Sequence, residues 1–79
     1  MQGMHSAAFE PVIEGIIRNK MSSKFTESVY RDIVDELGVI LGDNLLFLNI
    51  RDGFLIIEYK DHLRNRKGYK VDLNDFAKQ

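Results

Sequence analysis

The first half of the chain repeats apolar residues at spacings of three and four, the period of an amphipathic helix. One stripe begins near Glu10-Pro11, where proline suits the first helical turn because its missing N–H would have no partner there. A second stripe runs from Phe25 to Leu37, and Gly38 stands where a helix commonly stops. The stripes comprise Val12, Ile13, Ile16, Ile17 and Met21, then Phe25, Val29, Ile33 and Leu37.

The second half of the chain alternates apolar and polar residues, as strands with one buried face do. Leu45 to Arg51 and Phe54 to Lys60 flank Asp52-Gly53, the dipeptide that a type I′ hairpin turn prefers. This turn sets Arg51 opposite Phe54 and fixes the register of the hairpin. The register gives one continuous apolar face, in which Leu46 lies opposite Tyr59: Leu46, Leu48, Ile50, Leu55, Ile57 and Tyr59.

The remaining segments complete the predicted fold. Val39 to Leu41 fits either a very short strand or one more helical turn. Gly68 to Leu73 alternates like a third strand. Asn74 can cap a final short helix from Asp75 to Gln79, with Phe76 docked inward. The sequence therefore predicts an α+β fold, with two N-terminal helices packed on a small antiparallel three-stranded sheet in the order α-α-β-β-β-α.

Length and composition narrow the class of protein. A chain of 79 residues holds one domain, residues 1–79, of which we expect residues 1–8 to be disordered. The absence of cysteine excludes disulfides, thiolate metal sites and a cysteine nucleophile. No apolar run approaches the roughly 20 residues of a membrane helix, and no signal peptide is evident, so we expect a cytoplasmic protein without a membrane partner.

The other face of the hairpin mixes apolar and charged residues. Phe47, Phe54 and Ile56 lie on it together with Arg51. Apolar patches on a solvent side commonly mark partner sites, and a short chain that is 44% hydrophobic cannot bury all of its apolar surface alone. We therefore expect a non-enzymatic interaction or regulatory module that forms a homodimer, binds another protein, or does both.

Basic residues gather in one segment although the net charge of the chain is -1. Residues 60–70 carry five cations against Asp61 alone. Arg64, Arg66 and Lys67 are therefore candidates for contacts with nucleic-acid phosphates, and this is an alternative function.

A third hypothesis is enzymatic. Gly42-Asp43 and Glu58-Tyr59-Lys60 lie where strand parity and the hairpin register would place Asp43, Glu58 and Lys60 on one face. This arrangement resembles the core motif of the PD-(D/E)XK nuclease superfamily, with glycine in place of its proline and Glu27 as the helix carboxylate. The resemblance implies Asp43 and Glu58 as ligands of Mg²⁺ or Mn²⁺, and Lys60 as the catalytic cation. The alternative is a turn aspartate and two solvent-facing strand residues, which need no cofactor, and we favour it.

Overall fold

The computed structural model of the chain describes residues 9–77, so the expectation of disorder for residues 1–8 lies outside the described residues. The observed elements confirm the α+β class and the antiparallel three-stranded sheet. Two 3-10 turns, η2 and η3, follow α2 and β3. The bounds are α1 Phe9–Lys20, α2 Glu27–Leu41, η2 Gly42–Asn44, β1 Leu45–Arg51, β2 Phe54–Lys60, β3 Arg66–Asp72 and η3 Leu73–Asp75.

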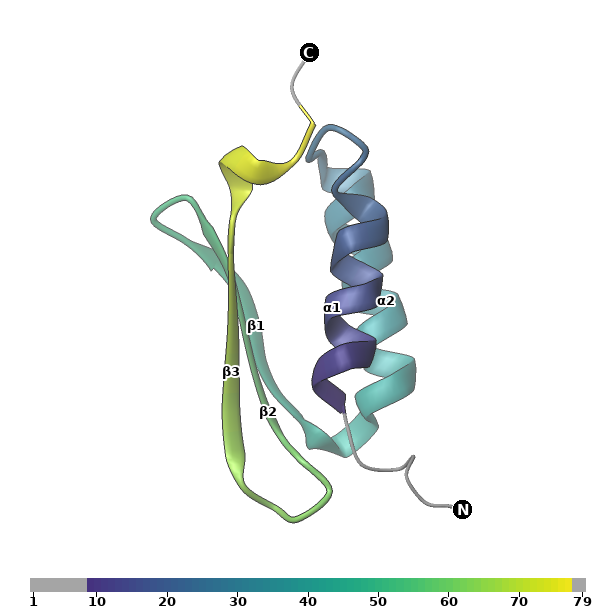
Figure 1. The fold of residues 1–79 in the computed structure, drawn as a ribbon, viewed down its shortest axis with the longest axis vertical. Coiled ribbons are helices and arrows are strands. Elements are labelled where there is room, and N and C mark those ends of the chain that lie inside the picture. Colours follow the sequence, from purple (N-terminus) through teal and green to yellow (C-terminus); the bar gives the residue numbers. More distant parts are fainter. Residues whose placement is uncertain (1–8, 78–79) are drawn as a thin grey trace.

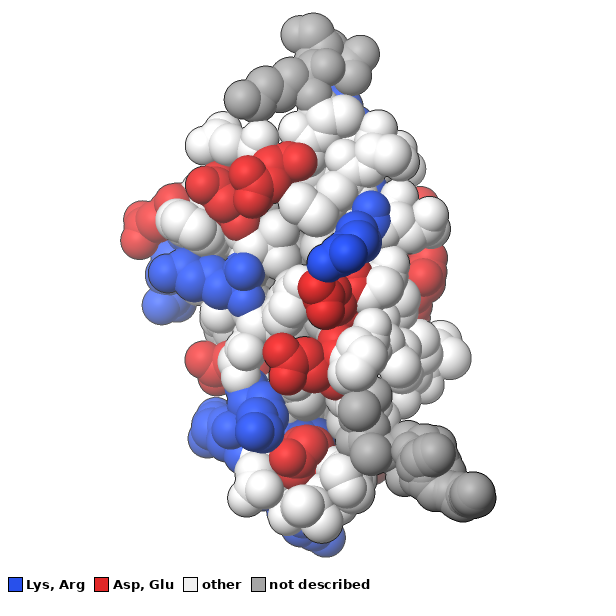
Figure 2. Space-filling view, viewed as in Figure 1, with Lys and Arg blue, Asp and Glu red and all other residues white. Residues whose placement is uncertain are grey.

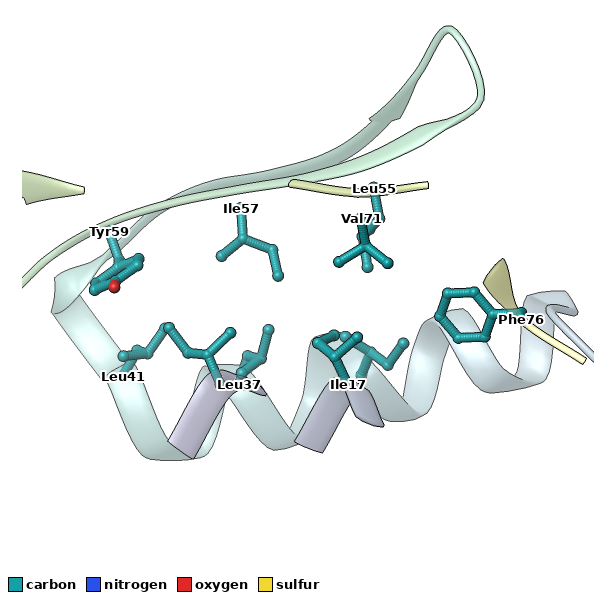
Figure 3. Close-up of a cluster of buried hydrophobic side chains, with 10 residues drawn as sticks. Ile17, Leu37, Leu41, Leu55, Ile57, Tyr59, Val71 and Phe76 are labelled. Carbon is teal, nitrogen blue, oxygen red and sulfur yellow. The ribbon is translucent and has the colours of Figure 1, made fainter. Parts of the chain in front are cut away.

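The fold has two layers (Figure 1). Helices α1 and α2 lie side by side and cover one face of the sheet, whose strand order is β1-β2-β3. The core forms between the layers, where both helix stripes meet the alternate residues of β2 and β3 (Figure 3). Its buried members are Ile13, Ile17, Ile33, Leu37, Leu41, Leu55, Ile57, Tyr59, Val71 and Phe76.

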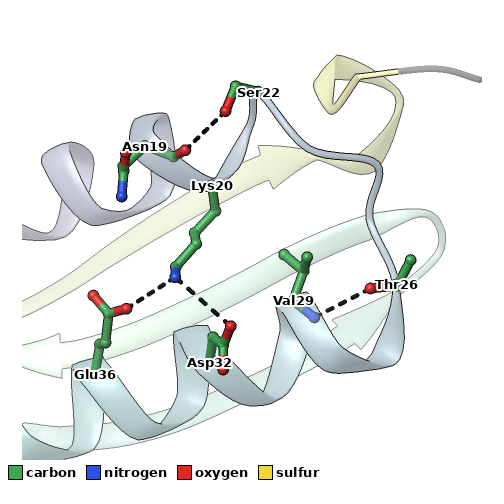
Figure 4. Close-up of polar contacts among 7 residues, drawn as sticks. All are labelled: Asn19, Lys20, Ser22, Thr26, Val29, Asp32 and Glu36. Atoms are coloured by element: carbon green, nitrogen blue, oxygen red, sulfur yellow. Dashed lines mark hydrogen bonds and ion pairs between the residues drawn. The ribbon is translucent and has the colours of Figure 1, made fainter.

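An ion-pair cluster ties the end of α1 to α2 on the outside of the helix layer (Figure 4). The ammonium of Lys20 lies 3.0 Å from the carboxylate of Glu36 and 3.8 Å from that of Asp32. The hydrogen bond to Glu36 is the main reason that the pKa of Lys20 is raised. Because these side chains are in contact with water, the pairs orient the two helices but stabilise them little.

The predicted register of the hairpin is confirmed close to the turn, where Arg51 pairs with Phe54 and Leu48 with Ile57. The register shifts further along, so the prediction that Leu46 lies opposite Tyr59 is wrong. A bulge places one additional residue in β1, and Leu45 takes the position opposite Tyr59 and packs on the core. Leu46 is consequently 39% exposed.

The apolar face of the hairpin is also less continuous than the alternation predicts. Ile50 lies on that face but is 38% exposed. The tip of the β1–β2 hairpin curves away from the helices (Figure 3). Burial of this face therefore depends on how far the helices extend over it. The alternation of the strand alone cannot predict that extent.

Helix α2 continues past Gly38 to Leu41, so Val39–Leu41 forms the additional helical turn that the sequence left open. Leu41 is buried, and this burial favours the extra turn. Gly42 is the residue after the helix, with φ of 53°, and its N–H donates to the carbonyl of Gly38. The prediction that Gly38 stops the helix is wrong, and Gly42 has that role.

Alanine substitution at these two glycines is expected to have opposite effects. Gly38→Ala should stabilise the protein by up to about 1 kcal/mol, since Gly38 is inside a helix and an added Cβ meets nothing within 4 Å. Gly42→Ala should destabilise it by about 1–3 kcal/mol, because a positive φ strains alanine. Urea unfolding followed by circular dichroism measures both changes. Destabilisation by Gly38→Ala would contradict the observed end of α2.

The predicted final helix is not formed, and its last two residues lie outside the described residues. The chain makes the 3-10 turn η3 instead, and the cap is Asp72 rather than Asn74, because the Asp72 carboxylate accepts from the N–H of Asn74 at 2.9 Å. A five-residue helix has too few hydrogen bonds to offset the entropy of nucleation. Phe76 is extended and buried, which places its ring on the core as expected.

Candidate functional site

One face of the sheet is left uncovered by the helices and strands that the structure describes (Figure 1). Leu55, Ile57 and Tyr59 of β2 point into the core, so the intervening residues of β2 point to the opposite side. The pairing of β1 and β3 with β2 assigns their residues in the same way. We call this surface the open face, and its side chains are Phe47, Asn49, Arg51, Phe54, Ile56, Glu58, Lys60, Arg66, Lys70 and Asp72.

The apolar part of the open face contains Phe47, Phe54 and Ile56, all half-buried. Cations cover both rings, with the Lys70 ammonium 4.5 Å from the Phe54 centroid and the Arg51 guanidinium 5.9 Å from the Phe47 centroid. The four predicted interface residues, Arg51 included, therefore lie on one face. Cation–π contacts at exposed sites contribute only about 0.5–1 kcal/mol, so a partner's side chain can displace them.

The polar part of the open face is rich in cations. It carries four basic side chains, Arg51, Lys60, Arg66 and Lys70, and two acidic ones. Lys60 and Arg66 are directly opposite one another on β2 and β3, a like-charge arrangement that is unfavourable by itself. Glu58 offsets part of this repulsion, because its carboxylate lies 3.7 Å from the Arg66 guanidinium. An anionic group at this end of the face would be attracted to both cations.

The two layers of the fold differ in charge. Residues 9–44, which include both helices, carry seven acidic and four basic side chains, and residues 45–72 carry six basic and four acidic ones. Figure 2 shows basic side chains over the strand side of the molecule and at its lower end, where β2 and β3 connect. Although the net charge of the whole chain is close to zero, the sheet layer is positively charged and favours anionic partners.

The structure separates the three residues predicted to contact nucleic acid. Arg66 pairs with Lys60 and lies on the open face, whereas Lys67 pairs with Tyr59 and lies on the opposite face of β3. Arg64 lies in the connection between the strands, with φ of 70°. The basic segment is thus continuous in sequence but divided in space, and it contributes Lys60, Arg66 and Lys70 to the open face.

Asp61 organises the connection between β2 and β3. Its carboxylate accepts hydrogen bonds from the N–H groups of Leu63 at 2.9 Å and Asn65 at 2.8 Å. These backbone hydrogen bonds, that of Asn65 first, lower the pKa of Asp61. The hydrogen bonds hold the turn and thereby fix where Arg66 begins the third strand.

The residues of the nuclease hypothesis are dispersed. Asp43 lies in η2, before β1 begins, so the parity argument that set it on the face of Glu58 does not apply. Glu27 begins α2, about 20 Å along the helix from Asp43, and it pairs with Arg31. Glu58 and Lys60 share the open face. The described residues contain no group of three or more histidine, aspartate or glutamate side chains placed to hold a metal ion.

Two members of the open face, Lys70 and Asp72, were not predicted from the sequence. Both lie on β3 at even spacing from Arg66, which is on the same face. The alternation of β3 is enough to place Arg66, Lys70 and Asp72 on one face of that strand. No short turn fixes the alignment of β3 with β2, so only the structure shows that this face is the open one.

Comparison of the chain with protein-family models, curated proteins and solved structures finds no match. Within residues 9–77, no helix has the length and apolar character required to cross a membrane. The open face, with its rings and cations, is the candidate functional site.

Proposed function

We propose that the protein is a non-catalytic interaction module that binds a protein partner through the open face. The observation that supports this function is the asymmetry of the sheet. One face is covered by both helices, and the other presents Phe47, Phe54 and Ile56 among four cations. Aromatic residues and arginine are the residue types enriched in protein interfaces.

The size and charge of the open face favour an extended acidic segment as the partner. Three strands of seven residues present about 23 by 14 Å, or roughly 300 Å², which is below the roughly 800 Å² that each partner commonly buries in a stable complex of two globular proteins. A single extended peptide fits this area. Acidic side chains would approach Lys60 and Arg66, and apolar side chains would contact the two rings.

The test is an NMR titration of the ¹⁵N-labelled protein with an extended peptide of alternating glutamate and leucine. We expect amide shifts concentrated on the residues of the open face. The double variant Arg51→Glu/Lys70→Glu should weaken binding at least tenfold, because it replaces attraction by repulsion on both sides of the rings. The control is Lys24→Glu, which reverses an exposed cation outside the sheet and should change the affinity less than twofold.

Two results would contradict the proposal. One is a peptide that shifts only residues of the helices. The other is equal affinity for the double variant and the Lys24→Glu control, provided that the circular dichroism spectra show both to be folded.

A second candidate function is binding of single-stranded nucleic acid on the same face. It is favoured by two half-buried rings beside cations, since bases stack on aromatic side chains while phosphates contact lysine and arginine. Titration with a decameric oligothymidylate distinguishes this function. It requires shifts on the open face and an affinity that falls steeply with added salt, whereas a protein module leaves the oligonucleotide unbound.

A further inference from the structure

Among the strands of residues 9–77, β3 lies at an edge of the sheet, because the strand order is β1-β2-β3. The other edge, β1, is interrupted by the bulge at Leu46, a device that protects edges against pairing with other chains. Strand β3 has no such interruption. Its seven residues, from Arg66 to Asp72, pair regularly with β2 and include no proline. It therefore offers a straight edge on which another strand can pair.

We propose that β3 pairs antiparallel with β3 of a second copy of this chain, about a two-fold axis at Tyr69, to form a six-stranded sheet. Each seven-residue edge then uses its full length. The register sets Arg66 opposite Asp72 of the second copy, Lys67 opposite Val71, Gly68 opposite Lys70, and Tyr69 opposite Tyr69.

Charge selects this register among those that keep both helix layers on one side of the sheet. Sliding one β3 by two residues along the other in one direction would set Arg66 opposite Lys70 of the second copy. Sliding it by two residues in the other direction would set Lys70 opposite Lys70 of the second copy. Like charges directly opposite one another are destabilising, whereas opposite charges stabilise a strand pair. Only pairing about Tyr69 joins Arg66 to an acidic residue without opposing two cations.

The pairing also relieves the unfavourable charge arrangement of the single chain. Lys60 and Arg66 are opposite one another, and Arg66 has a contact of only 3.7 Å with the half-exposed Glu58. In the dimer, Arg66 would lie between Lys60 of its own chain and Asp72 of the second copy. The three neighbouring strands would then carry a cation, a cation and an anion side by side. Both Arg66 residues gain this neighbour because the interface is symmetric.

Charged side chains of α1 lie near Tyr69 and therefore near the proposed two-fold axis. Burial, Glu14 and Glu10 raise the pKa of Tyr69 whereas Arg18 lowers it, so these three α1 side chains lie within electrostatic reach of Tyr69. Each copy thus brings two acidic side chains and one basic side chain of α1 near the axis. On the opposite side, the open faces of the two copies join, so the dimer also doubles the proposed binding surface.

Engineered disulfides test the register, and the chain has no native cysteine to interfere. Gly68→Cys and Lys70→Cys are made as separate variants, and each is oxidised alone and after mixing. Directly opposite residues have Cα atoms about 4.5–5.5 Å apart, within the range of a disulfide, whereas Gly68 and its own copy would be about 8 Å apart. We expect cross-linked dimer in the mixture, at least fivefold above either variant alone. Equal cross-linking in all three samples would overturn the register.

Charge exchange tests the same contact without oxidation. Arg66→Glu should weaken the dimer about tenfold or more in sedimentation equilibrium, because two attractive pairs become repulsive. Adding Asp72→Lys should restore dimerisation, and Lys67→Glu is the control because Lys67 faces Val71 of the second copy. Circular dichroism checks that each variant is folded, since Asp72 also caps η3.

Two results would overturn the dimer. One is a wild-type protein that stays monomeric up to millimolar concentration. The other is a dimer that Arg66→Glu and Lys67→Glu weaken equally. Neither result affects the peptide titration of the open face, so failure of the dimer and failure of the proposed function are distinguishable.

Discussion

Replacing Leu37 by alanine is expected to destabilise the protein by about 3–4 kcal/mol. Leu37 is completely buried, and its side chain lies in the core between the helices and the sheet (Figure 3). The change removes apolar burial and leaves a cavity that the neighbouring core side chains fill only in part. A domain of this length has a total stability of about 4–12 kcal/mol, so this one substitution removes a large fraction of it.

The matched control is Val39→Ala, two residues further along the same helix. Val39 is 85% exposed, so its truncation removes little buried surface and should change the free energy of unfolding by less than about 0.5 kcal/mol. Urea unfolding followed by circular dichroism measures both variants. Similar losses for the two variants would mean that α2 does not present Leu37 to the core as described.

Replacing Phe76 by alanine is expected to cost about 3–4 kcal/mol, an effect similar to that of Leu37→Ala. Phe76 is 3% exposed, and its ring meets that of Phe25 edge-on at a centroid separation of 4.9 Å. The next residue, Ala77, donates its N–H to the carbonyl of Met21 at 3.0 Å. Phe76 therefore fastens the end of the described chain to the connection between the helices, and thermal unfolding should show a clear decrease in Tm.

The control for Phe76 is Asn74→Ala, which also distinguishes the observed end of the chain from the predicted helix. The side chain of Asn74 is exposed, and Asp72 provides the cap, so the change should be within about 0.5 kcal/mol. If Asn74 instead capped a helix, its removal would cost about 1 kcal/mol. A loss of that size would indicate that Asn74 caps a helix.

Local patterns in the sequence were sufficient for the helices and for the hairpin near its turn. The spacing of apolar residues determined which faces of α1 and α2 are buried, because the period of a helix is fixed by its backbone geometry. Asp52-Gly53 determined the register as far as Phe47 and Glu58, because this dipeptide tolerates the positive φ angles of the turn.

Only the tertiary structure decided the features on which the candidate site depends. The bulge at Leu46 and the extension of α2 to Leu41 arise from packing on the core, to which residues distant in the sequence contribute. The alignment of β3 with β2 brings Arg66 opposite Lys60 and separates it from Lys67, its neighbour in the sequence. The sequence by itself determined the two helices with their buried stripes and the hairpin near its turn, because these follow from local periodicity and turn chemistry. The open face, and the edge of β3 that the described strands leave unpaired, required the assembled sheet, because the surface left uncovered depends on how the layers pack.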